Sequence, residues 1–224
     1  MKDNKLDNPV WHSLNESHQA FSLKYGDALF YSPEYCVFGE QRQSKNISDA
    51  ITSYAQLSPS FFVIGEKPNL PNTFNIQQEV ACLQMVVSEK IDIAPTHSIV
   101  KLESEHLDDV LTLVAVAYPH FFQPKTLFLG SNYGIYQDGK LVAMTGERMK
   151  MHEYTEVSSV ITHPDYTGRG YAKQLLAHTV NQIFDETKKP YLHVAKSNVA
   201  AIALYEKLGF QTRREITFWG IKAG

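Results

Sequence analysis

Residues 160–172 read VITHPDYTGRGYA, and this stretch decides the fold. An apolar, β-branched run ends at His163 and Pro164, and two glycines, Gly168 and Gly170, precede a segment with helical periodicity. A strand, a glycine turn and a helix in this order present backbone N–H groups at a helix N-terminus, where the macrodipole adds about half a positive charge. Glycine also lets a ligand approach the backbone closely. The stretch therefore predicts either a phosphate-binding turn or a plain strand-to-helix connection.

The 224-residue chain has the composition of a folded protein, with 43% apolar and 20% charged residues. Its net charge of −3 gives no reason to expect a nucleic-acid partner. The sequence lacks an apolar run of the ~20 residues that a membrane helix needs, and its start lacks the apolar core of a signal peptide. We therefore expect a cytoplasmic protein without a membrane partner.

The histidines and cysteines do not follow a known metal-binding spacing. None of the nine histidines occurs in an HExxH, HxH or Cys-paired pattern, so we expect no metal. The two cysteines, Cys36 and Cys82, lie far apart and do not suggest a disulfide framework.

Residues 89–98 (EKIDIAPTHS) predict a boundary between two parts of the chain. Residues 1–92 predict an α/β extension that ends with a strand at residues 80–87 and carries no chemical motif, so it is either a packing domain or a lid over a substrate pocket. Residues 98–224 predict a helix, a hairpin, a strand, the glycine turn, a helix, a strand, a helix and one or two strands. This order predicts an α/β (α+β) domain with a mixed sheet flanked by helices.

Two common phosphate-binding folds do not fit this order. The hairpin is indicated by Asp138-Gly139, which suits a type I′ turn, and it places the glycine turn after the third strand of this part. A Rossmann domain needs GxGxxG after its first strand, and a P-loop needs GxxxxGK[ST], which does not occur. Both are excluded.

The strand end VITHP at residues 160–164, the turn TGRGYA at residues 167–172 and the segment NVAAIALYEKLGF at residues 198–210 follow one another in this order. With these three motifs, the sequence resembles the GNAT superfamily of acetyl-CoA-dependent N-acyltransferases. The pyrophosphate loop of that superfamily reads Q/R-x-x-G-x-G/A, and TGRGYA at residues 167–172 fits except at Thr167. VITHP at residues 160–164 matches the end of the preceding strand, and NVAAIALYEKLGF at residues 198–210 matches the second signature. The likeness covers residues 98–224 and is greatest to the bacterial FR47-like branch. In that branch an N-terminal extension, one reading of which is a degenerate second GNAT-like half, precedes the catalytic domain.

The resemblance implies a mostly antiparallel sheet and acetyl-CoA (coenzyme A) as cofactor. The implied cofactor-binding residues are Val160, Ile161, Thr162, Gly168, Arg169, Gly170, Tyr171, Ala172, Lys173 and Asn198. The first three would pair with the pantetheine arm through their backbone, and the next six would surround the pyrophosphate. Asn198 would hydrogen-bond the arm or only cap a helix. Arg169 and Lys173 add positive charge or form a solvated helix end, and Thr167 implies weaker cofactor binding at most.

Acetylating an amine poses two proton problems. A lysine-like ammonium, with a pKa of ~10.4, costs roughly 4.6 kcal/mol to deprotonate at pH 7, and the departing thiolate, with a pKa of ~8.5, needs a proton or a hydrogen bond. By resemblance, Tyr205 would serve the thiolate, although it is also read as an aromatic packed on a helix. Glu156 is the implied base, with Glu147, His193 or a water chain as alternatives.

The sequence thus predicts an N-acetyltransferase that moves an acetyl group from acetyl-CoA to an amine by direct attack in a ternary complex. The alternative is a catalytically inactive acyl-CoA-binding or scaffold module. The acceptor, a small-molecule or peptide amine, is not encoded in a recognisable pattern, and neither is the choice between monomer and homodimer. We expect specificity to come from the N-terminal half and from residues 118–132 and 149–155.

Overall fold

The structure is a computed structural model that describes residues 4–41, 46–117 and 122–224. Its strands are β1 (Ser22–Tyr25), β2 (Ala28–Tyr31), β3 (Phe38–Gln41), β4 (Ser60–Ile64), β5 (Phe74–Val86), β6 (Val100–Leu102), β7 (Asn132–Gln137), β8 (Lys140–Arg148), β9 (Tyr154–Thr162), β10 (Lys189–Ala195) and β11 (Gln211–Ala223). Its α-helices are α1 (Pro9–Asn15), α2 (Ser48–Ala55), α3 (Leu107–Ala117), α4 (Tyr171–Asp185) and α5 (Val199–Lys207). Short 3₁₀ helices are η1 (Lys5–Asp7), η2 (Gln19–Phe21), η3 (Ser104–His106), η4 (Thr126–Leu129) and η5 (Pro164–Tyr166).

The described strands form one sheet in the order β1-β2-β3-β4-β11-β5-β10-β9-β8-β7-β6. Most neighbours are antiparallel, and β3–β4 and β9–β10 are parallel pairs. The predicted type I′ turn is present between β7 and β8, where Asp138 and Gly139 have φ angles of 50° and 74°. The mixed, mostly antiparallel sheet flanked by helices confirms the predicted fold class.

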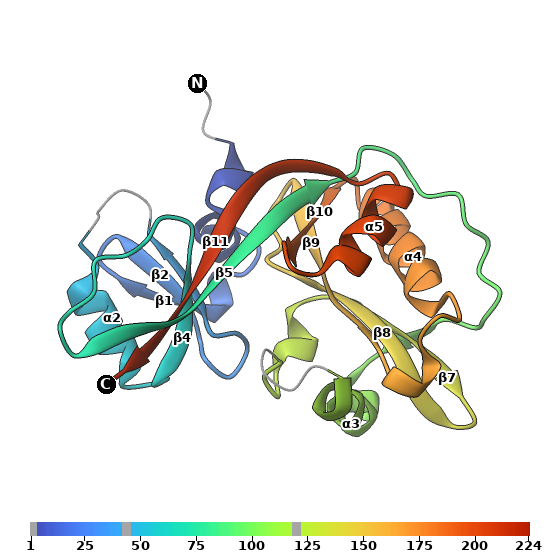
Figure 1. The fold of residues 1–224 in the computed structure, drawn as a ribbon, viewed down its shortest axis with the longest axis horizontal. Coiled ribbons are helices and arrows are strands. Elements are labelled where there is room, and N and C mark those ends of the chain that lie inside the picture. The colour runs from blue at the N-terminus through green and yellow to red at the C-terminus, as the bar shows by residue number, and fades with distance from the viewer. Residues whose placement is uncertain (1–3, 42–45, 118–121) are drawn as a thin grey trace.

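Strands β5 and β11 connect the two halves of the molecule. They pair antiparallel from Phe74 opposite Ala223 to Val86 opposite Gln211. Figure 1 shows both strands running from the N-terminal half into the half that contains β7 to β10. The carboxyl end of β5 also pairs with β10, where Gln84 lies opposite His193. The sheet is therefore continuous across the expected boundary near residues 92–98, and the division into two domains stays a prediction.

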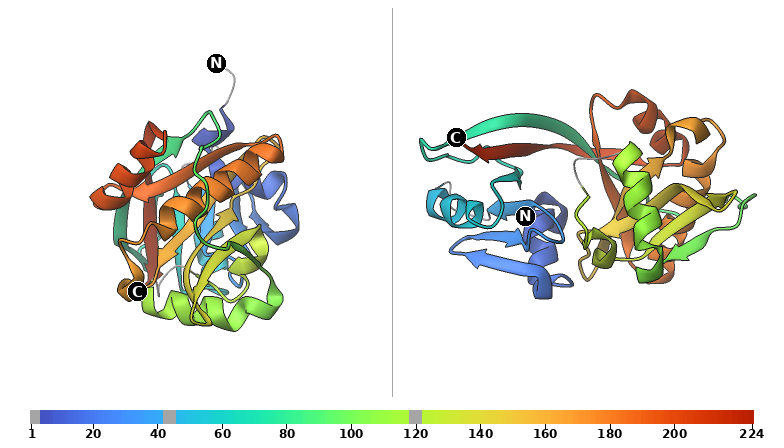
Figure 2. Two further views of the ribbon diagram at one scale, coloured as in Figure 1. Left: turned by 90° about the vertical axis from the view of Figure 1, so that its right-hand side faces the viewer. Right: turned by 90° about the horizontal axis from the view of Figure 1, so that it is seen from below.

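The helices of the C-terminal half cover the two faces of its strands. In α4, Leu176 and Val180 pack against Val157 of β9 and Leu192 of β10, together with Leu208 after α5. Helix α3 packs through residues such as Val110 and Leu113 on β8 and the end of β9. Figure 2 shows α3 on one side of these strands, with α4 and α5 on the other. Helices thereby cover both faces of these strands.

Candidate active site

A gap forms in the sheet because β9 and β10 pair only at their starts. Lys189 to Tyr191 of β10 lie opposite Tyr154 to Glu156 of β9. Beyond this point β10 pairs with β5, while β9 keeps its pairing with β8 alone. The two parallel strands separate, and a pocket of about 230 Å³ lies between them. The pocket is lined by residues 156–161 of β9, residues 193–195 of β10, and Phe122, Thr126, Arg148, Asn198 and Tyr205.

A β-bulge in β9 faces this pocket. Met144 of β8 lies opposite Ile161, but Gly146 lies opposite Ser158, so β9 carries one extra residue. Ser159 adopts a φ angle of 51°, the left-handed region that a residue with a β-carbon enters only where the surroundings impose it. Ser159 and Val160 have no partner residue on β8. This unpaired part of β9 therefore forms part of the pocket wall.

The expected pantetheine-binding residues lie at different depths along β9. Val160 and Ile161 line the pocket, whereas Thr162 lies beyond it and pairs with Ala143 of β8. The edge of β9 that faces the gap has no β10 partner over these residues. An extended chain could pair with this edge as a strand would.

The glycine turn has the geometry that its sequence predicts. Gly168 and Gly170 have φ angles of 76° and 78°, and Gly170 is the N-cap of α4. No side chain caps this helix, so its first N–H groups remain for a ligand or water. The side chain of Tyr171 is buried against His97, with ring centroids 4.8 Å apart, and only its backbone is left for the turn.

The two basic residues near the turn are exposed. The guanidinium of Arg169 stacks 4.7 Å above the Tyr166 ring and donates to the carbonyl oxygen of Asp165 at 3.2 Å. Lys173 lies in the first turn of α4 and is solvated, and Ala172 beside it is half-buried. Both cations can approach an anion at the turn, but neither is fixed there by a buried contact.

Replacing Gly168 by Ala tests the turn. A β-carbon at Gly168 would meet no atom within 4 Å, so the cost is the positive φ angle, roughly 1 kcal/mol of stability. We expect the dissociation constant of coenzyme A, measured by isothermal titration calorimetry, to rise about tenfold. Gly139→Ala is a matched control, because Gly139 has a similar φ angle of 74° and equally open surroundings but lies in the β7–β8 turn. Equal coenzyme A affinity in both variants would contradict a phosphate-binding role.

Helix α5 brings the second signature to the pocket. Asn198 caps α5, with its side-chain oxygen accepting from the Ala201 N–H at 3.1 Å, and it also lines the pocket. Tyr205 is 7% exposed, packs 5.9 Å from the Phe210 ring and lines the same pocket. The structural alternatives given for these residues, a helix cap and a packed aromatic, thus coexist with a place at the pocket.

A buried polar cluster forms another part of the pocket wall. The Glu156 carboxylate, 1% exposed, accepts from Arg148 Nε at 2.8 Å and from Arg148 Nη2 at 3.1 Å, and lies 2.8 Å from Nδ1 of His193. Burial alone would raise the pKa of Glu156, but the Arg148 charge and the His193 hydrogen bond outweigh it and lower this pKa to about 2. The carboxylate is therefore an anion at neutral pH. The Arg148 guanidinium also stacks 4.6 Å above the Phe38 ring, which belongs to the N-terminal half.

Glu147, the neighbouring alternative, lies elsewhere. Its Oε2 accepts from Lys150 Nζ at 2.6 Å and from the Ser131 N–H at 3.1 Å, and the residue is not part of the pocket wall. Alternation along β8 turns Glu147 and Arg148 to opposite faces of the sheet. Glu147 thus forms a structural ion pair with Lys150 on the face of β8 that lies away from the pocket.

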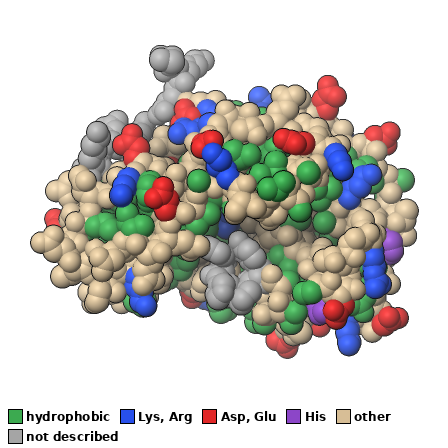
Figure 3. All heavy atoms as spheres, in the orientation of Figure 1, with side chains coloured by type: hydrophobic (Ala, Val, Ile, Leu, Met, Phe, Trp, Pro, Cys, Tyr) green, Lys and Arg blue, Asp and Glu red, His purple; other side chains and the backbone are tan. Residues whose placement is uncertain are grey.

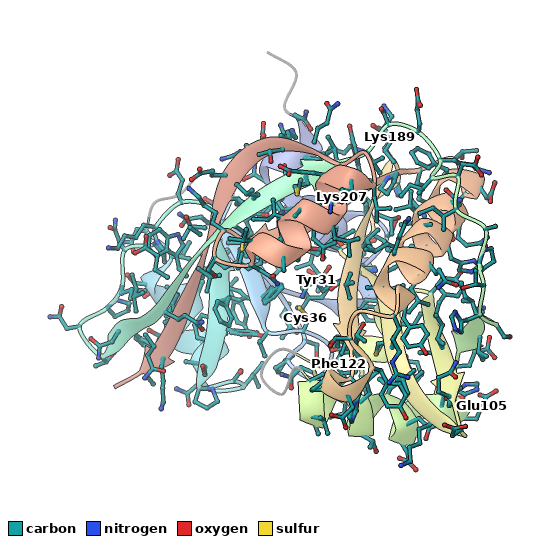
Figure 4. The ribbon with its side chains drawn as sticks, turned by 45° about the vertical axis from the view of Figure 1, so that its right-hand side comes forward. Tyr31, Cys36, Glu105, Phe122, Lys189 and Lys207 are labelled. Carbon is teal, nitrogen blue, oxygen red and sulfur yellow. The ribbon has the colours of Figure 1, made fainter. Side chains whose placement is uncertain are left out.

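Sequence reasoning missed two features of the pocket and anticipated a third. Arg148 was not singled out, although its position next to Glu147 at the end of a strand was a usable signal. The bulge at Ser159 has no signal in the sequence, because it depends on the register with β8. Of the expected specificity segment, Phe122 and Thr126 line the pocket, and residues 118–121 lie outside the described residues. Figure 4 places Phe122 near the junction of the two halves, below Tyr31 and Cys36.

The described residues contain neither a metal-binding cluster nor a membrane-spanning helix. Within the described ranges, no group of three or more His, Cys, Asp or Glu residues is arranged to hold a metal ion. In the same part of the chain, no helix has the length and apolar character to cross a membrane. Positive and negative side chains are mixed over the face shown in Figure 3.

The chain has the features of an acyltransferase: separated parallel strands, an uncapped glycine turn and the tyrosine of α5. The family profile of the acetyltransferase (GNAT) family matches residues 99–210, half of the chain, so the chain belongs to this family. The FR47-like branch is not specifically supported. Members of the GNAT family generally use acetyl-CoA.

Individual relatives agree with this assignment. A crystal structure described as a GNAT-family acetyltransferase from Novosphingobium aromaticivorans superposes with a TM-score of 0.89 at 29% identity, covering 99% of this chain and 100% of that chain. The ribosomal protein bS18-alanine N-acetyltransferase of Escherichia coli is 35% identical over 80 residues, 35% of this chain and 53% of the relative. The spermine/spermidine N(1)-acetyltransferase of Bacillus subtilis is 29% identical over 112 residues, 46% of this chain and 68% of the relative. The chain spans about half the length of the bS18-alanine N-acetyltransferases that it matches.

Proposed function

We propose that this protein transfers an acetyl group from acetyl-CoA to a primary amine by direct attack in a ternary complex. The observation that carries the proposal is the pocket between β9 and β10, because one wall holds a buried anion, Glu156, and another holds Tyr205. Bound acetyl-CoA supplies the activated acetyl group. The remaining chemistry falls to the residues of the pocket.

The residues present fit this cofactor. The N-terminus of α4 has no side-chain cap and follows two glycines with positive φ angles, which suits a pyrophosphate. The β9 edge at Val160 and Ile161 suits the extended arm, with Asn198 beside it. Ser159 and Val160 line the pocket and have no partner residue on β8, and we assign their backbone N–H groups the stabilisation of negative charge on the acetyl oxygen.

The low pKa of Glu156 decides its role. Direct transfer of a proton from an ammonium with a pKa of ~10.4 to a carboxyl with a pKa of about 2 is uphill by roughly 11 kcal/mol. The neutral amine is available at pH 7 for ~4.6 kcal/mol by equilibrium with the bulk solvent, and this route needs no protonated Glu156. We therefore assign Glu156 the part of a fixed anion that attracts and orients the ammonium, and the proton leaves through water. Glu156 as the base stays a prediction, and its low pKa argues against this role.

Tyr205 serves the opposite end of the reaction. Its hydroxyl donates a hydrogen bond to the departing sulfur and so stabilises the thiolate. A free phenol, with a pKa of ~10, is about 1.5 units too weak an acid to protonate a thiolate with a pKa of ~8.5 downhill. Hydrogen-bond donation without full proton transfer is therefore the main contribution.

The pocket wall also suggests the class of acceptor. Glu156 is the one carboxylate among the described residues that line the pocket, and Arg148 already neutralises it. A polyamine would find no further anion in this wall for its second positive charge. A peptide α-amine, with a pKa of ~7.7–8.0, costs only ~1 kcal/mol to deprotonate at pH 7. We propose an α-amine, or another amine without a second nearby cation, as the acceptor.

An amine panel tests the proposed function. Coenzyme A release would be followed at pH 7.5 with an alanyl peptide, a peptide whose free amine is on lysine, and spermidine. We expect the catalytic efficiency kcat/KM to be highest for the α-amine peptide, at least about tenfold above spermidine. Preference for spermidine would contradict the acceptor class. Acetyl-CoA binding without turnover of any amine would indicate the inactive acyl-CoA-binding module instead.

A further inference from the structure

A row of polar side chains crosses five neighbouring strands and ends at the pocket. The members of this polar row are Arg213 of β11, Gln84 of β5, His193 of β10, Glu156 of β9 and Arg148 of β8. Each hydrogen-bonds to the next. Gln84 has no exposed surface and belongs to the N-terminal half, far from the family motifs in the sequence. The row therefore ties a residue of that half to the pocket wall.

The orientation of the Gln84 amide is fixed from two sides. Its Oε1 accepts from Arg213 Nη1 at 2.7 Å, and a guanidinium can only donate. Its Nε2 donates to the Leu6 carbonyl oxygen at 2.8 Å, and a carbonyl can only accept. Arg213 is itself held by Asp7, whose Oδ1 lies 2.5 Å from Nη2. A flipped amide would place N–H against N–H and oxygen against oxygen, so one orientation is allowed.

This orientation determines the protonation of His193. The second N–H of Gln84 points to Nε2 of His193 at 3.1 Å, so Nε2 must carry a lone pair. The ring proton is then on Nδ1, which donates to the Glu156 carboxylate at 2.8 Å. An imidazolium would turn Nε2–H against the Gln84 N–H, two donors without an acceptor. Gln84 thus selects the neutral ring with its proton on Nδ1.

We propose that Gln84 is a positioning residue for the amine site, acting through His193 on Glu156. The inference rests on the proposed acetyl transfer. With His193 neutral, this wall holds one positive charge, on Arg148, and one negative charge, on Glu156, and so has no net positive charge to repel an ammonium beside the Glu156 carboxylate. If His193 took up a proton, the wall would gain a positive charge 2.8 Å from the carboxylate that attracts the ammonium. The amide of Gln84 opposes this gain, because its N–H faces the ring nitrogen that an imidazolium would need to donate from, and so preserves affinity for a cationic amine to lower pH.

The groups around His193 support this view from every strand that contacts it. Glu156 on β9 favours the imidazolium, while Arg148 behind it on β8 opposes it. The Tyr191 and Phe218 rings contact the His193 ring edge-on, with centroids 5.6 Å and 5.3 Å away, and offer no charge. From β5 and β11, Gln84 supplies the opposing N–H, and the Arg213 charge lies behind it, paired with Asp7.

The substitution Gln84→Glu tests the proposal. A carboxylate at this position accepts a hydrogen bond from Nε2–H and therefore favours the imidazolium. We expect the amine KM to rise with falling pH from a point at least about one unit higher than in the wild type, which is about tenfold in KM on the acid side. The value of kcat at saturating amine should change much less. Gln77→Glu, on the exposed face of the same strand, is the matched control and should leave the profile unchanged.

A second variant and a direct measurement keep the test decisive. Gln84→Leu removes the opposing N–H without adding charge, and it should move the KM profile in the same direction by less. Nitrogen-15 spectra of the histidine rings, with His193→Gln as the assignment control, should show His193 with only Nδ1 protonated in the wild type and with both nitrogens protonated in Gln84→Glu.

The outcomes separate the two proposals. If folded Gln84→Glu and Gln84→Leu keep the wild-type KM profile, or if the wild-type His193 ring carries its proton on Nε2, Gln84 has no positioning role. If the wild type acetylates no amine while the ring spectra are as expected, the proposed function fails and the tautomer assignment stands.

Discussion

Tyr205→Phe is expected to lower kcat by about 10²-fold or more and to leave the affinity for acetyl-CoA unchanged. The substitution keeps the ring that packs against Phe210 and removes only the hydroxyl that we assign to the departing sulfur. Single-turnover kinetics with saturating acetyl-CoA would measure the loss in the chemical step. Calorimetric titration with coenzyme A would measure binding separately.

Tyr154→Phe is the control for this loss. Tyr154 is half-buried at the start of β9, with its ring 6.4 Å from the Tyr191 ring, and it is not part of the pocket wall. Its loss of a hydroxyl should change kcat less than about twofold. Turnover by Tyr205→Phe at the wild-type rate would remove Tyr205 from the mechanism and return it to the role of a packed aromatic.

Glu156→Gln is expected to lower the free energy of unfolding at pH 7 by about 3 kcal/mol, because the partly buried guanidinium of Arg148 loses its counter-charge. The lowered pKa of Glu156 leads to a similar free energy. A carboxyl with an ordinary pKa of 4.5 in the unfolded chain and about 2 in the folded protein contributes roughly 3 kcal/mol above pH 4.5. This contribution disappears as the pH falls from 4.5 toward 2. The same substitution should raise the amine KM, because the anion that attracts the ammonium is gone.

Urea unfolding at pH 7 and at pH 3 would measure both effects. The wild type should lose stability between these values, and the difference between wild type and Glu156→Gln should become smaller at pH 3. Glu215→Gln is the control, because Glu215 is 62% exposed in its pair with Lys196 and should matter by less than about 1 kcal/mol. A loss of stability in Glu156→Gln that is independent of pH would contradict the ion-pair explanation.

Local sequence signals predicted the parts of the site that depend on neighbouring residues. The apolar run, the glycines and the helical period predicted β9, the turn and the start of α4, since backbone geometry at Gly168 and Gly170 is decided within a few residues. The cap at Asn198 and the Asp138-Gly139 turn were predictable for the same reason. The order of these elements predicted a mixed sheet with helices on its faces, and the resemblance to the GNAT superfamily added that the sheet is mostly antiparallel.

The remaining parts depend on contacts between distant segments. A strand was expected at residues 80–87, but β5 begins at Phe74, because pairing with β11 extends it beyond its apolar part. Its place between β11 and β10, and hence the contact of Gln84 with His193, could not be inferred from either segment alone. The ion pair of Arg148 with Glu156 likewise depends on the register of β8 with β9.

The β5–β11 pair also constrains how the molecule is made. Its strands come from opposite parts of the sequence, with Phe74 opposite Ala223, so β5 cannot find this partner until β11 has been synthesised. Until then the N-terminal strands have no neighbour beyond β4, and β5 presents an unpaired edge. Long-range pairing of this kind is slow and leaves strand edges open to association with other chains. Of the described strands, β11 is therefore the one whose synthesis allows both halves to join in one sheet.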